Sequence, residues 1–424
     1  MRSDQTALRA ARSGPMSARY LSFVGAIGLS SIGDAAWTIA LASTVVGKTD
    51  ATTAGAVLAL AGVPRIAALL GTGAVADRYG PVRVMVGSDL MRCALMGAAA
   101  VAVLGIGPSV PLLIAVAALL GLLGAFFLPA SGALRPQLLP PDELVRGNAL
   151  YLMGLRAGQT AGGPVGAWLL GLGGMVAVAA ANAVSFLVSA VAVSRSRPPV
   201  PAEQKQPTAA GPPVPAEPPA SRPKLITQIA EGMRYAAAHR ELRLLLGASG
   251  LVGLAGAGPI NIGLVLLSEH LGAGAAGAGV LLSAFTVGAA AAFLVSLVLP
   301  VRRRPGIGVV VSVVAQAAAL LLLGHVGSVV AAAACYAALG AAGAQASLIL
   351  VSLIQRLAAV PMRGRVMAIV SLLDFVAPTI GNLALGAAVD GFGFPVTLAL
   401  HAVAAAAALA LFLASPVLRG ARLD

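Results

Sequence analysis

The segment GAVADRYGPVR, residues 73–83, decides the fold because it places three charges between two long apolar stretches. These stretches, roughly 54–76 and 82–104, each have the length of about 20 residues that a helix needs to cross a hydrocarbon core about 30 Å thick. Gly80 permits a tight turn, and Pro81 suits the first position of a helix. The segment therefore predicts a short charged loop between two membrane-spanning helices.

The alternation of apolar spans and short polar loops continues along all 424 residues. Hydrophobic residues make up 58% of the chain and charged residues 10%, whereas soluble domains carry about 25% charged residues. Twelve spans can be drawn, at roughly 21–45, 54–76, 82–104, 110–130, 148–170, 174–194, 244–267, 277–300, 306–323, 327–350, 366–388 and 394–415. We therefore expect an all-α polytopic membrane protein with twelve transmembrane helices in two pseudo-symmetric six-helix bundles.

A polar segment divides the spans into an N-terminal bundle, residues 1–194, and a C-terminal bundle, residues 244–424. Residues 195–223 are rich in proline and polar side chains, which is typical of a linker without a core. Residues 224–243 predict an amphipathic helix on the membrane surface, because Ile226, Ile229, Met233 and Ala237 share one face. The segment 195–243 is thus expected to be a cytoplasmic connection between the bundles.

The segments that carry the fifth span of each half resemble one another. At a shift of 217 residues, Arg146-Gly147 aligns with Arg363-Gly364, and Gly174 aligns with Gly391. Two matching six-helix halves are typical of secondary transporters, whose substrate site lies between the halves near the bilayer midplane.

The distribution of basic residues predicts the orientation in the membrane. Of the 28 Lys and Arg residues, only Lys48 falls in a loop on one side, and Arg65, Arg92 and Arg156 fall within spans. All the others gather on the second side, which the positive-inside rule identifies as the cytoplasm. We therefore expect a multi-pass protein of the plasma membrane with both termini cytoplasmic. The net charge of +13 reflects these loops and predicts contact with the lipid bilayer, not with nucleic acid.

Residues 73–83 resemble the signature loop of the major facilitator superfamily, G-x-x-x-D-R-x-G-x-x-R, at Gly73, Asp77, Arg78, Gly80 and Arg83. In that family the loop locks the two halves together on the cytoplasmic side while the carrier faces outward. The resemblance carries that role onto Asp77 and Arg83, as a cytoplasmic gate. The alternative is an ordinary positive-inside loop.

Further patches resemble parts of the same family. GQTAGGPVGAW, which begins at Gly158, is similar to the glycine-rich antiporter motif at Gly162, Gly163, Pro164 and Gly166, although ordinary packing of small residues is an alternative. SSIGDAAW, SDLMR and EGMRYAAAHRELR resemble the efflux subgroup that includes siderophore and macrolide exporters. Two features depart from the family pattern: the equivalent loop of the second half, VRRRPGIG, lacks the aspartate, and span four lacks the usual buried arginine.

Ionisable residues within the spans are candidate functional residues, because a charge at the bilayer centre costs about 3 kcal/mol or more. Six are present: Asp34, Arg65, Asp89, Arg92, Arg156 and Asp374. Asp34 lies near the middle of its span and is the first candidate for proton binding, with either Arg65 or Arg156 as its partner. The alternative for Asp34 is a permanent structural ion pair.

The remaining charges divide between the gate and the cavity. Asp89 and Arg92 are three residues apart on one helix face and closer to the cytoplasmic end, so we assign them to the gate. Arg156 and Asp374 map to nearly equivalent depths and are expected to face each other across the central cavity. Arg156 would hold an anionic substrate group there, or Asp374 a proton or cation. Other candidate cavity residues are Trp37, Phe126, Phe127, Asn261, Gln316, Gln345, Phe375 and Asn382.

These features predict a monomeric secondary transporter that exports a hydrophobic or amphipathic small molecule in exchange for protons, by alternating access. Alternatives with the same fold are a nutrient importer and a lysolipid flippase. An enzyme or a receptor is disfavoured, because the sequence shows no Ser-His-Asp set, no metal-ligand spacing and no P-loop. We expect no cofactor, since the proton gradient supplies the energy.

Overall fold

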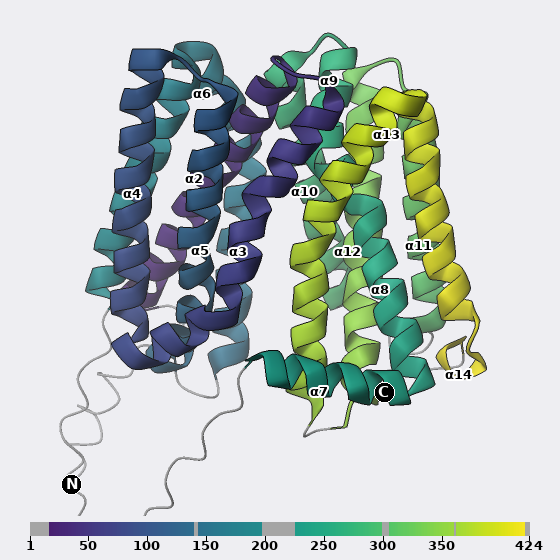
Figure 1. Ribbon diagram of the computed structural model, residues 1–424. Coiled ribbons are helices and arrows are strands. Elements are labelled where there is room, and N and C mark those ends of the chain that lie inside the picture. The colour runs from purple at the N-terminus through teal and green to yellow at the C-terminus, as the bar shows by residue number, and fades with distance from the viewer. Residues whose placement is uncertain (1–16, 140–142, 197–224, 299–304, 360–361, 420–424) are drawn as a thin grey trace, which may run out of the picture.

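The computed structural model describes residues 17–139, 143–196, 225–298, 305–359 and 362–419. Among these residues, ten helical segments are long and apolar enough to cross a membrane. Figure 1 shows them as two bundles side by side. The N-terminal half comprises α2 (Ala18–Val46), α3 (Ala51–Tyr79), α4 (Pro81–Ile106), α5 (Val110–Leu138) and α6 (Leu144–Arg195). The C-terminal half comprises α8 (Arg240–Gly258), η2 (Pro259–Gly263), α9 (Leu264–His270), α10 (Gly274–Val298), α11 (Pro305–Leu323), α12 (Val329–Leu357), α13 (Arg363–Leu413) and the short α14 (Pro416–Arg419).

Two of these helices are too long for a single crossing. α6 has 52 residues and α13 has 51, which is about 75 Å of helix each at 1.5 Å per residue. Both are broken by glycines with non-helical dihedral angles: Gly173 and Gly174 in α6, and Gly393 in α13. Two arms in each helix are compatible with the predicted twelve crossings. The break in α13 lies at Gly393, two residues after Gly391, the residue that aligns with Gly174.

The predicted loop 73–83 is almost entirely helical. α3 continues to Tyr79 and α4 begins at Pro81, so Gly80 alone joins them, with a positive φ of 84°. Gly80 and Pro81 therefore have the predicted roles, whereas Gly73 and Asp77 lie in the last turns of α3. The prediction of a loop was wrong because a membrane helix can continue past the hydrocarbon core, where polar residues such as Arg78, a good helix former, are solvated without ending it.

The connecting helix α7 (Leu225–Ala238) lies across the ends of the helices of the C-terminal half, at the bottom of Figure 1. Glu231 forms an ion pair of 3.1 Å with Arg365, and Gly232 lies against the backbone of Arg365. We call this side the α7 face and the other side the opposite face. Met233 and Ala237 of the predicted apolar stripe are exposed, and so is Arg234 of the predicted polar side, so the contact of the stripe with the membrane surface stays a prediction.

The connection between the halves differs from its predicted bounds at its C-terminal end. The surface helix ends at Ala238, and the predicted residues from Arg240 onward begin the first helix of the C-terminal half. Most of the predicted linker, residues 197–223, lies outside the described part of the chain.

Candidate functional site

A cavity of about 550 Å³ lies between the two halves, within the range of pockets that hold drug-sized ligands. Helices α2, α3, α4, α5 and α6 contribute to its wall from one half, and η2, α9, α10 and α13 from the other. Its described lining includes four charged residues and three side-chain amides: Asp34, Arg65, Arg92, Arg156, Gln159, Asn261 and Asn382. The cavity therefore brings charged and amide side chains together within a largely apolar wall.

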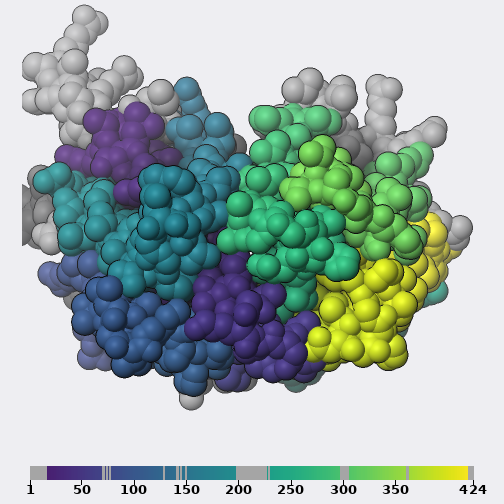
Figure 2. Space-filling model, turned by 90° about the horizontal axis from the view of Figure 1, so that it is seen from above, coloured from purple at the N-terminus to yellow at the C-terminus, as the bar shows by residue number. Residues whose placement is uncertain are grey.

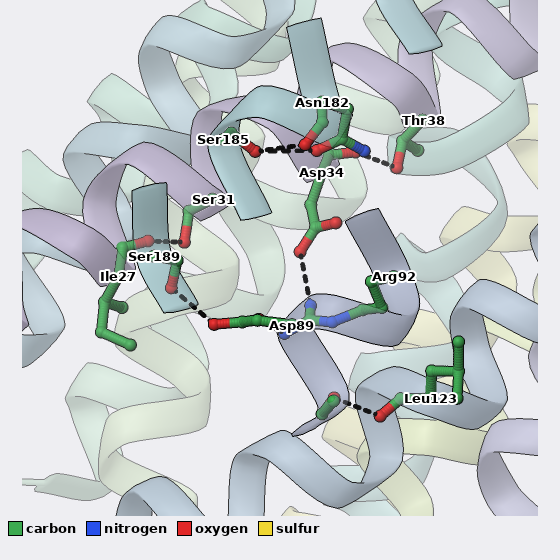
Figure 3. A network of polar contacts seen from close by, with 11 residues as sticks. Ile27, Ser31, Asp34, Thr38, Asp89, Arg92, Leu123, Asn182, Ser185 and Ser189 are labelled. Atoms are coloured by element: carbon green, nitrogen blue, oxygen red, sulfur yellow. Dashed lines mark hydrogen bonds and ion pairs between the residues drawn. The ribbon is translucent and has the colours of Figure 1, made fainter. Parts of the chain in front are cut away.

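Arg92 on α4 lies at the centre of an ionic network at the cavity wall (Figure 3). Its guanidinium pairs directly with Asp89, and its Nη1 lies 3.8 Å from Oδ2 of Asp34 on α2. The Asp89 side chain is 0% exposed, whereas the Asp34 side chain is 46% exposed. One carboxylate is thus sealed between helices, and the other lines the cavity.

The buried part of this network is held from three further sides. The hydroxyl of Ser189 on α6 donates to Oδ2 of Asp89 over 2.7 Å. The rings of Phe127 and Phe186 lie 4.8 and 4.3 Å from the guanidinium carbon of Arg92, a cation–π arrangement. Arg92 therefore contacts Asp89 and both rings independently of Asp34, and Asp34 is not its only counter-charge.

The structure corrects the predicted partner of Asp34. Sequence depth suggested Arg65 or Arg156, but the ion pair is with Arg92. Arg92 also lines the cavity, so it lies at the candidate substrate site, and its predicted role in the gate stays a prediction. The predicted pairing of Asp89 with Arg92 is present. Depth along a helix can be counted from sequence, whereas the direction in which each side chain points depends on how the helices pack.

The other predicted charges lie in two different pockets. Arg65 lies 5.1 Å from the ring centre of Phe375, and Nη1 of Arg156 donates to Gln159 over 3.0 Å. Asp374 lines a smaller pocket of about 130 Å³ together with Arg65 and Phe375. The expectation that Arg156 and Asp374 face each other across the central cavity is therefore wrong, because α13 packs against α3 and brings Asp374 to the Arg65 side.

The uncharged candidates also separate. Trp37, Phe127, Asn261 and Asn382 line the central cavity, as predicted, and Phe375 lines the smaller pocket. Gln316 is buried within the C-terminal half, Gln345 accepts a hydrogen bond from Ser296, and Phe126 is not part of the described lining. Sequence reasoning missed Gln159, although its position three residues after Arg156 places both on one helix face.

One wall of the cavity contains a π-helix. η2 interrupts the first helix of the C-terminal half between Gly258 and Leu264 and places Ile260 and Asn261 in the cavity wall. The carbonyl of Pro259 accepts a hydrogen bond of 2.9 Å from the buried hydroxyl of Tyr336. Single π-turns occur frequently at functional sites.

Two helix pairs join the halves on the side of the opposite face. Figure 2 views this face and shows α6 beside α10 and α3 beside α13. A Cβ on Gly163 would lie 2.8 Å from the carbonyl oxygen of Gly279, and one on Gly279 would lie 2.7 Å from that of Gly163. The hydroxyl of Ser283 donates to the carbonyl of Thr160 over 2.8 Å. These backbones approach closely because glycine has no side chain.

The start of α3 is capped from both halves. Asp390 on α13 accepts a hydrogen bond of 2.7 Å from the backbone N–H of Thr52, and Asp50 accepts one of 2.6 Å from that of Thr53. The hydrogen bonds from Thr53 lower the pKa of the Asp50 carboxyl, which lies outside the spans. Asp390 therefore adds a polar link between the halves at the opposite face.

The antiporter-like patch serves two interfaces. Gly162 and Gly166 lie against α2, where an added Cβ would meet the carbonyl oxygens of Ile32 at 2.7 Å and Ala36 at 2.6 Å. Gly163 faces α10 in the other half, and Pro164 is exposed. The functional role of the patch stays a prediction.

The predicted gate residues near Gly80 are not engaged in a lock among the residues described here. Arg78 lies over the ring of Tyr79 at 5.5 Å and Arg83 is exposed; neither pairs with a described carboxylate. The side chain of Asp77 lies outside the described part. The locking role stays a prediction.

Two helical halves around a central cavity, joined near one face, are the arrangement of secondary transporters. The sequence profile of the Major Facilitator Superfamily matches residues 23–358. The chain therefore belongs to this superfamily of transporters.

Solved structures support the same fold. A mutant of the nucleoside transporter NupG is 15% identical with a TM-score of 0.73, over 93% of this chain and 100% of the other. A bacterial homolog of the human lysosomal transporter Spinster, inward-facing and occupied, is 16% identical with a TM-score of 0.66, over 93% and 95%. A D-xylose–proton symporter is 14% identical with a TM-score of 0.69, over 95% and 99%. No curated protein sequence matches the chain.

Proposed function

We propose that this protein is a proton-coupled secondary transporter that exports a hydrophobic or amphipathic small molecule by alternating access. It acts as a monomer in the plasma membrane, with the α7 face and both termini in the cytoplasm. It needs no cofactor, because the proton gradient drives transport. Asp34 is the proton site. The observation that carries this proposal is the half-exposed Asp34 carboxylate beside the buried Arg92–Asp89 pair.

The arrangement of the two carboxylates suits a proton that must bind and leave. Asp34 is half exposed within the cavity, so its carboxylate can exchange a proton with water there. Protonation removes its attraction to Arg92, and Arg92 keeps its pair with Asp89. The helices therefore tolerate both protonation states without an unpaired buried charge, which is otherwise costly.

The contacts between the halves support alternating access with the α7 face open. The hydrogen bonds from Thr52 to Asp390 and from Ser283 to Thr160 join the halves, as does the contact of Gly163 with Gly279. All of these residues lie in the helix portions nearer the opposite face. Opening that face requires these contacts to break, and the signature residues near Gly80 would close the α7 face in exchange.

A second candidate is proton-linked uptake, which the charge of the cavity favours. The described lining contains three arginines and one carboxylate, so protonation of Asp34 makes the site more positive. If the substrate is an anion, proton and substrate binding then favour each other, and by linkage this coupling is reciprocal. Such a carrier would move both in the same direction.

The test is substrate-dependent proton movement in everted membrane vesicles, screened across a panel of amphipathic compounds. We expect Asp34→Asn to abolish gradient-driven transport without loss of substrate binding, because the variant mimics the neutral carboxyl with nearly unchanged shape. Asp374→Asn is the matched control, since Asp374 is also an acid within a span but lines the smaller pocket. That control should retain gradient-driven transport.

The direction of proton movement on substrate addition distinguishes the two candidates. Protons leave the everted vesicles if substrate and proton are exchanged, and they enter if both move in the same direction. The absence of substrate-dependent proton movement with every compound, in folded protein, would contradict both candidates. Normal gradient-driven transport by Asp34→Asn would exclude Asp34 as the proton site.

A further inference from the structure

The three arginines of the central cavity are not equivalent. Arg92 has two carboxylates and two aromatic rings around it. Arg65 and Arg156 also line the cavity, but no carboxylate lies within ion-pairing distance of either among the described residues. Their recorded contacts are neutral: the ring of Phe375 for Arg65 and the amide oxygen of Gln159 for Arg156. Within the described part of the chain, the cavity therefore contains two cations that have no carboxylate at ion-pairing distance.

Arg65 and Arg156 lie at similar depth. At 1.5 Å per residue, Arg65 is about 21 Å along α3 from its first residue at the opposite face. Arg156 is about 25 Å from the break at Gly173 that ends its arm of α6 at the same face. Both positions fall within the depth of a hydrocarbon core about 30 Å thick. Charged residues there are costly and mark substrate or ion pathways.

The rest of the wall provides apolar surface from the other half. Ile260, Leu264, Leu282 and Phe285 line the cavity from the C-terminal half, and Asn261 adds an amide. An apolar pocket with a few convergent polar groups fixes the orientation of a drug-sized ligand. All the charged groups of the described lining come from the N-terminal half, which also supplies apolar residues such as Trp37, Leu58 and Leu120. The described lining from the C-terminal half is uncharged.

We propose that the cavity binds an amphipathic organic anion, whose acidic group lies between Arg65 and Arg156 and whose apolar body lies against the C-terminal half. Guanidinium groups bind carboxylate and phosphate through charge-assisted hydrogen bonds. Asp34 is the one carboxylate in the described lining, so its negative charge opposes the ligand. The inference rests on the proposed transport function but holds for either direction of transport.

The test uses probes that share one ring system and differ in charge: 2-naphthylacetate, 2-naphthyl phosphate, 2-naphthylacetamide and 2-(2-naphthyl)ethylamine. Binding to the purified full-length protein is measured by ligand-induced thermal stabilisation and by titration. We expect at least one of the two anions to bind about tenfold more tightly than the amide, the magnitude of a hydrogen bond to a charged group. The amine should bind most weakly. The two anions distinguish carboxylate from phosphate recognition.

Variants identify the groups responsible. Arg65→Gln and Arg156→Gln should each reduce the preference for the anion over the amide about tenfold, because each removes a charged hydrogen-bond donor. Asp34→Asn should strengthen anion binding, since it removes the opposing charge. Arg234→Gln, on the exposed surface of α7 and outside the cavity lining, is the matched control and should leave the preference unchanged.

The proposal is overturned if the amide or amine binds as tightly as the anions, or if neither arginine variant changes the preference. It is also overturned if none of the probes binds to protein that remains folded. Failure of the proposed function has a different signature, in which anion binding persists and no substrate-dependent proton movement occurs. Proton-coupled transport of neutral or cationic compounds would retain the function and exclude this substrate class.

Discussion

The two halves of the protein use different chemistry at corresponding places. Arg92 on α4, the third helix of its half, reaches Asp34 on the first helix α2. Gln316 on α11, the third helix of the other half, donates its Nε2–H to the carbonyl of Val252 on the first helix α8, over 3.1 Å. Arg92 and Gln316 each lie eleven residues after the proline that begins their helix. One helix pair is thus joined by ions and its counterpart by a neutral amide.

Other buried polar groups of the C-terminal half are neutral as well. Tyr336 donates to the carbonyl of Pro259, Ser296 donates to Gln345, and the ring nitrogen of His401 lies 2.9 Å from the carbonyl of Thr397. Neutral hydrogen bonds contribute about 1 kcal/mol each and do not change when a carboxylate gains a proton. We therefore expect a proton-dependent change to begin in the N-terminal half, while these hydrogen bonds of the C-terminal half stay the same.

The largest expected effect in this comparison is that of Asp89→Asn on stability. The substitution leaves the buried Arg92 without its close counter-charge, and Asp34 at 3.8 Å replaces it only in part. Loss of one partner of a buried pair typically costs about 3–5 kcal/mol. We expect a loss at the lower end of this range in the free energy of unfolding, measured by denaturation in detergent.

The matched variant in the other half is Gln316→Leu, which removes a single neutral hydrogen bond. Its free energy of unfolding should fall by about 1 kcal/mol or less. If Gln316→Leu costs as much as Asp89→Asn, the two halves do not differ in the way proposed here.

The sequence predicts the helices well because crossing a bilayer sets their length and composition. The predicted gap between 170 and 174 contains Gly173, and the second residue of the break, Gly174, is the first residue of the next predicted span. The gap between 388 and 394 contains Gly393. Helix ends are less well predicted, since α3 continues through the charged segment to Tyr79. Polar residues outside the hydrocarbon core do not by themselves end a helix.

The candidate site is predicted only as a set of charges and not as a set of contacts. Asp34, Arg65 and Arg156 stand out because charged residues are rare within spans, and all three line the central cavity. The partner of Asp34 was mistaken, because a helix can rotate about its axis without changing its hydropathy. The π-turn at Pro259 has no sequence signal that we recognised, although it places Asn261 in the wall.

A smaller effect is expected at the contact between the halves, where Gly163 meets Gly279. Gly163→Ala would place a methyl group within 2.8 Å of a backbone carbonyl, so α6 and α10 must move apart. Overpacking of this kind costs about 1–3 kcal/mol, here borne by the state with the opposite face closed. We expect the labelling of Asn261→Cys by an impermeant thiol reagent, added from the opposite face, to rise about tenfold.

The labelling is measured in a background with Cys93→Ser and Cys335→Ser, so that the cavity position alone reacts. Gly171→Ala on the same arm of α6 is the control, because a Cβ there meets nothing within 4 Å. Equal labelling of the Gly163 and Gly171 variants would show that the glycine contact does not hold the opposite face closed.

The smallest expected effect separates two carboxylates that cap the same helix end from different halves. Asp50 and Thr53 belong to the N-terminal half, so their hydrogen bonds persist whichever face is open. The pKa of Asp50 is lowered by these bonds, so the cap is present above the ordinary carboxyl range and is lost only as the pH falls through the lowered pKa. Asp50 is therefore charged at neutral pH, and its contribution cancels between the two states.

Asp390 caps Thr52 from the C-terminal half, so its hydrogen bond exists only while the opposite face is closed. Both residues are exposed, which reduces the value of the bond to about 0.5 kcal/mol. Asp390→Asn should therefore raise the labelling of Asn261→Cys from the opposite face about twofold. Asp50→Asn should leave the labelling unchanged even though it removes a cap from the same helix. If Asp50→Asn changes the labelling as much as Asp390→Asn does, the cap acts through the stability of α3 and not through the contact between the halves.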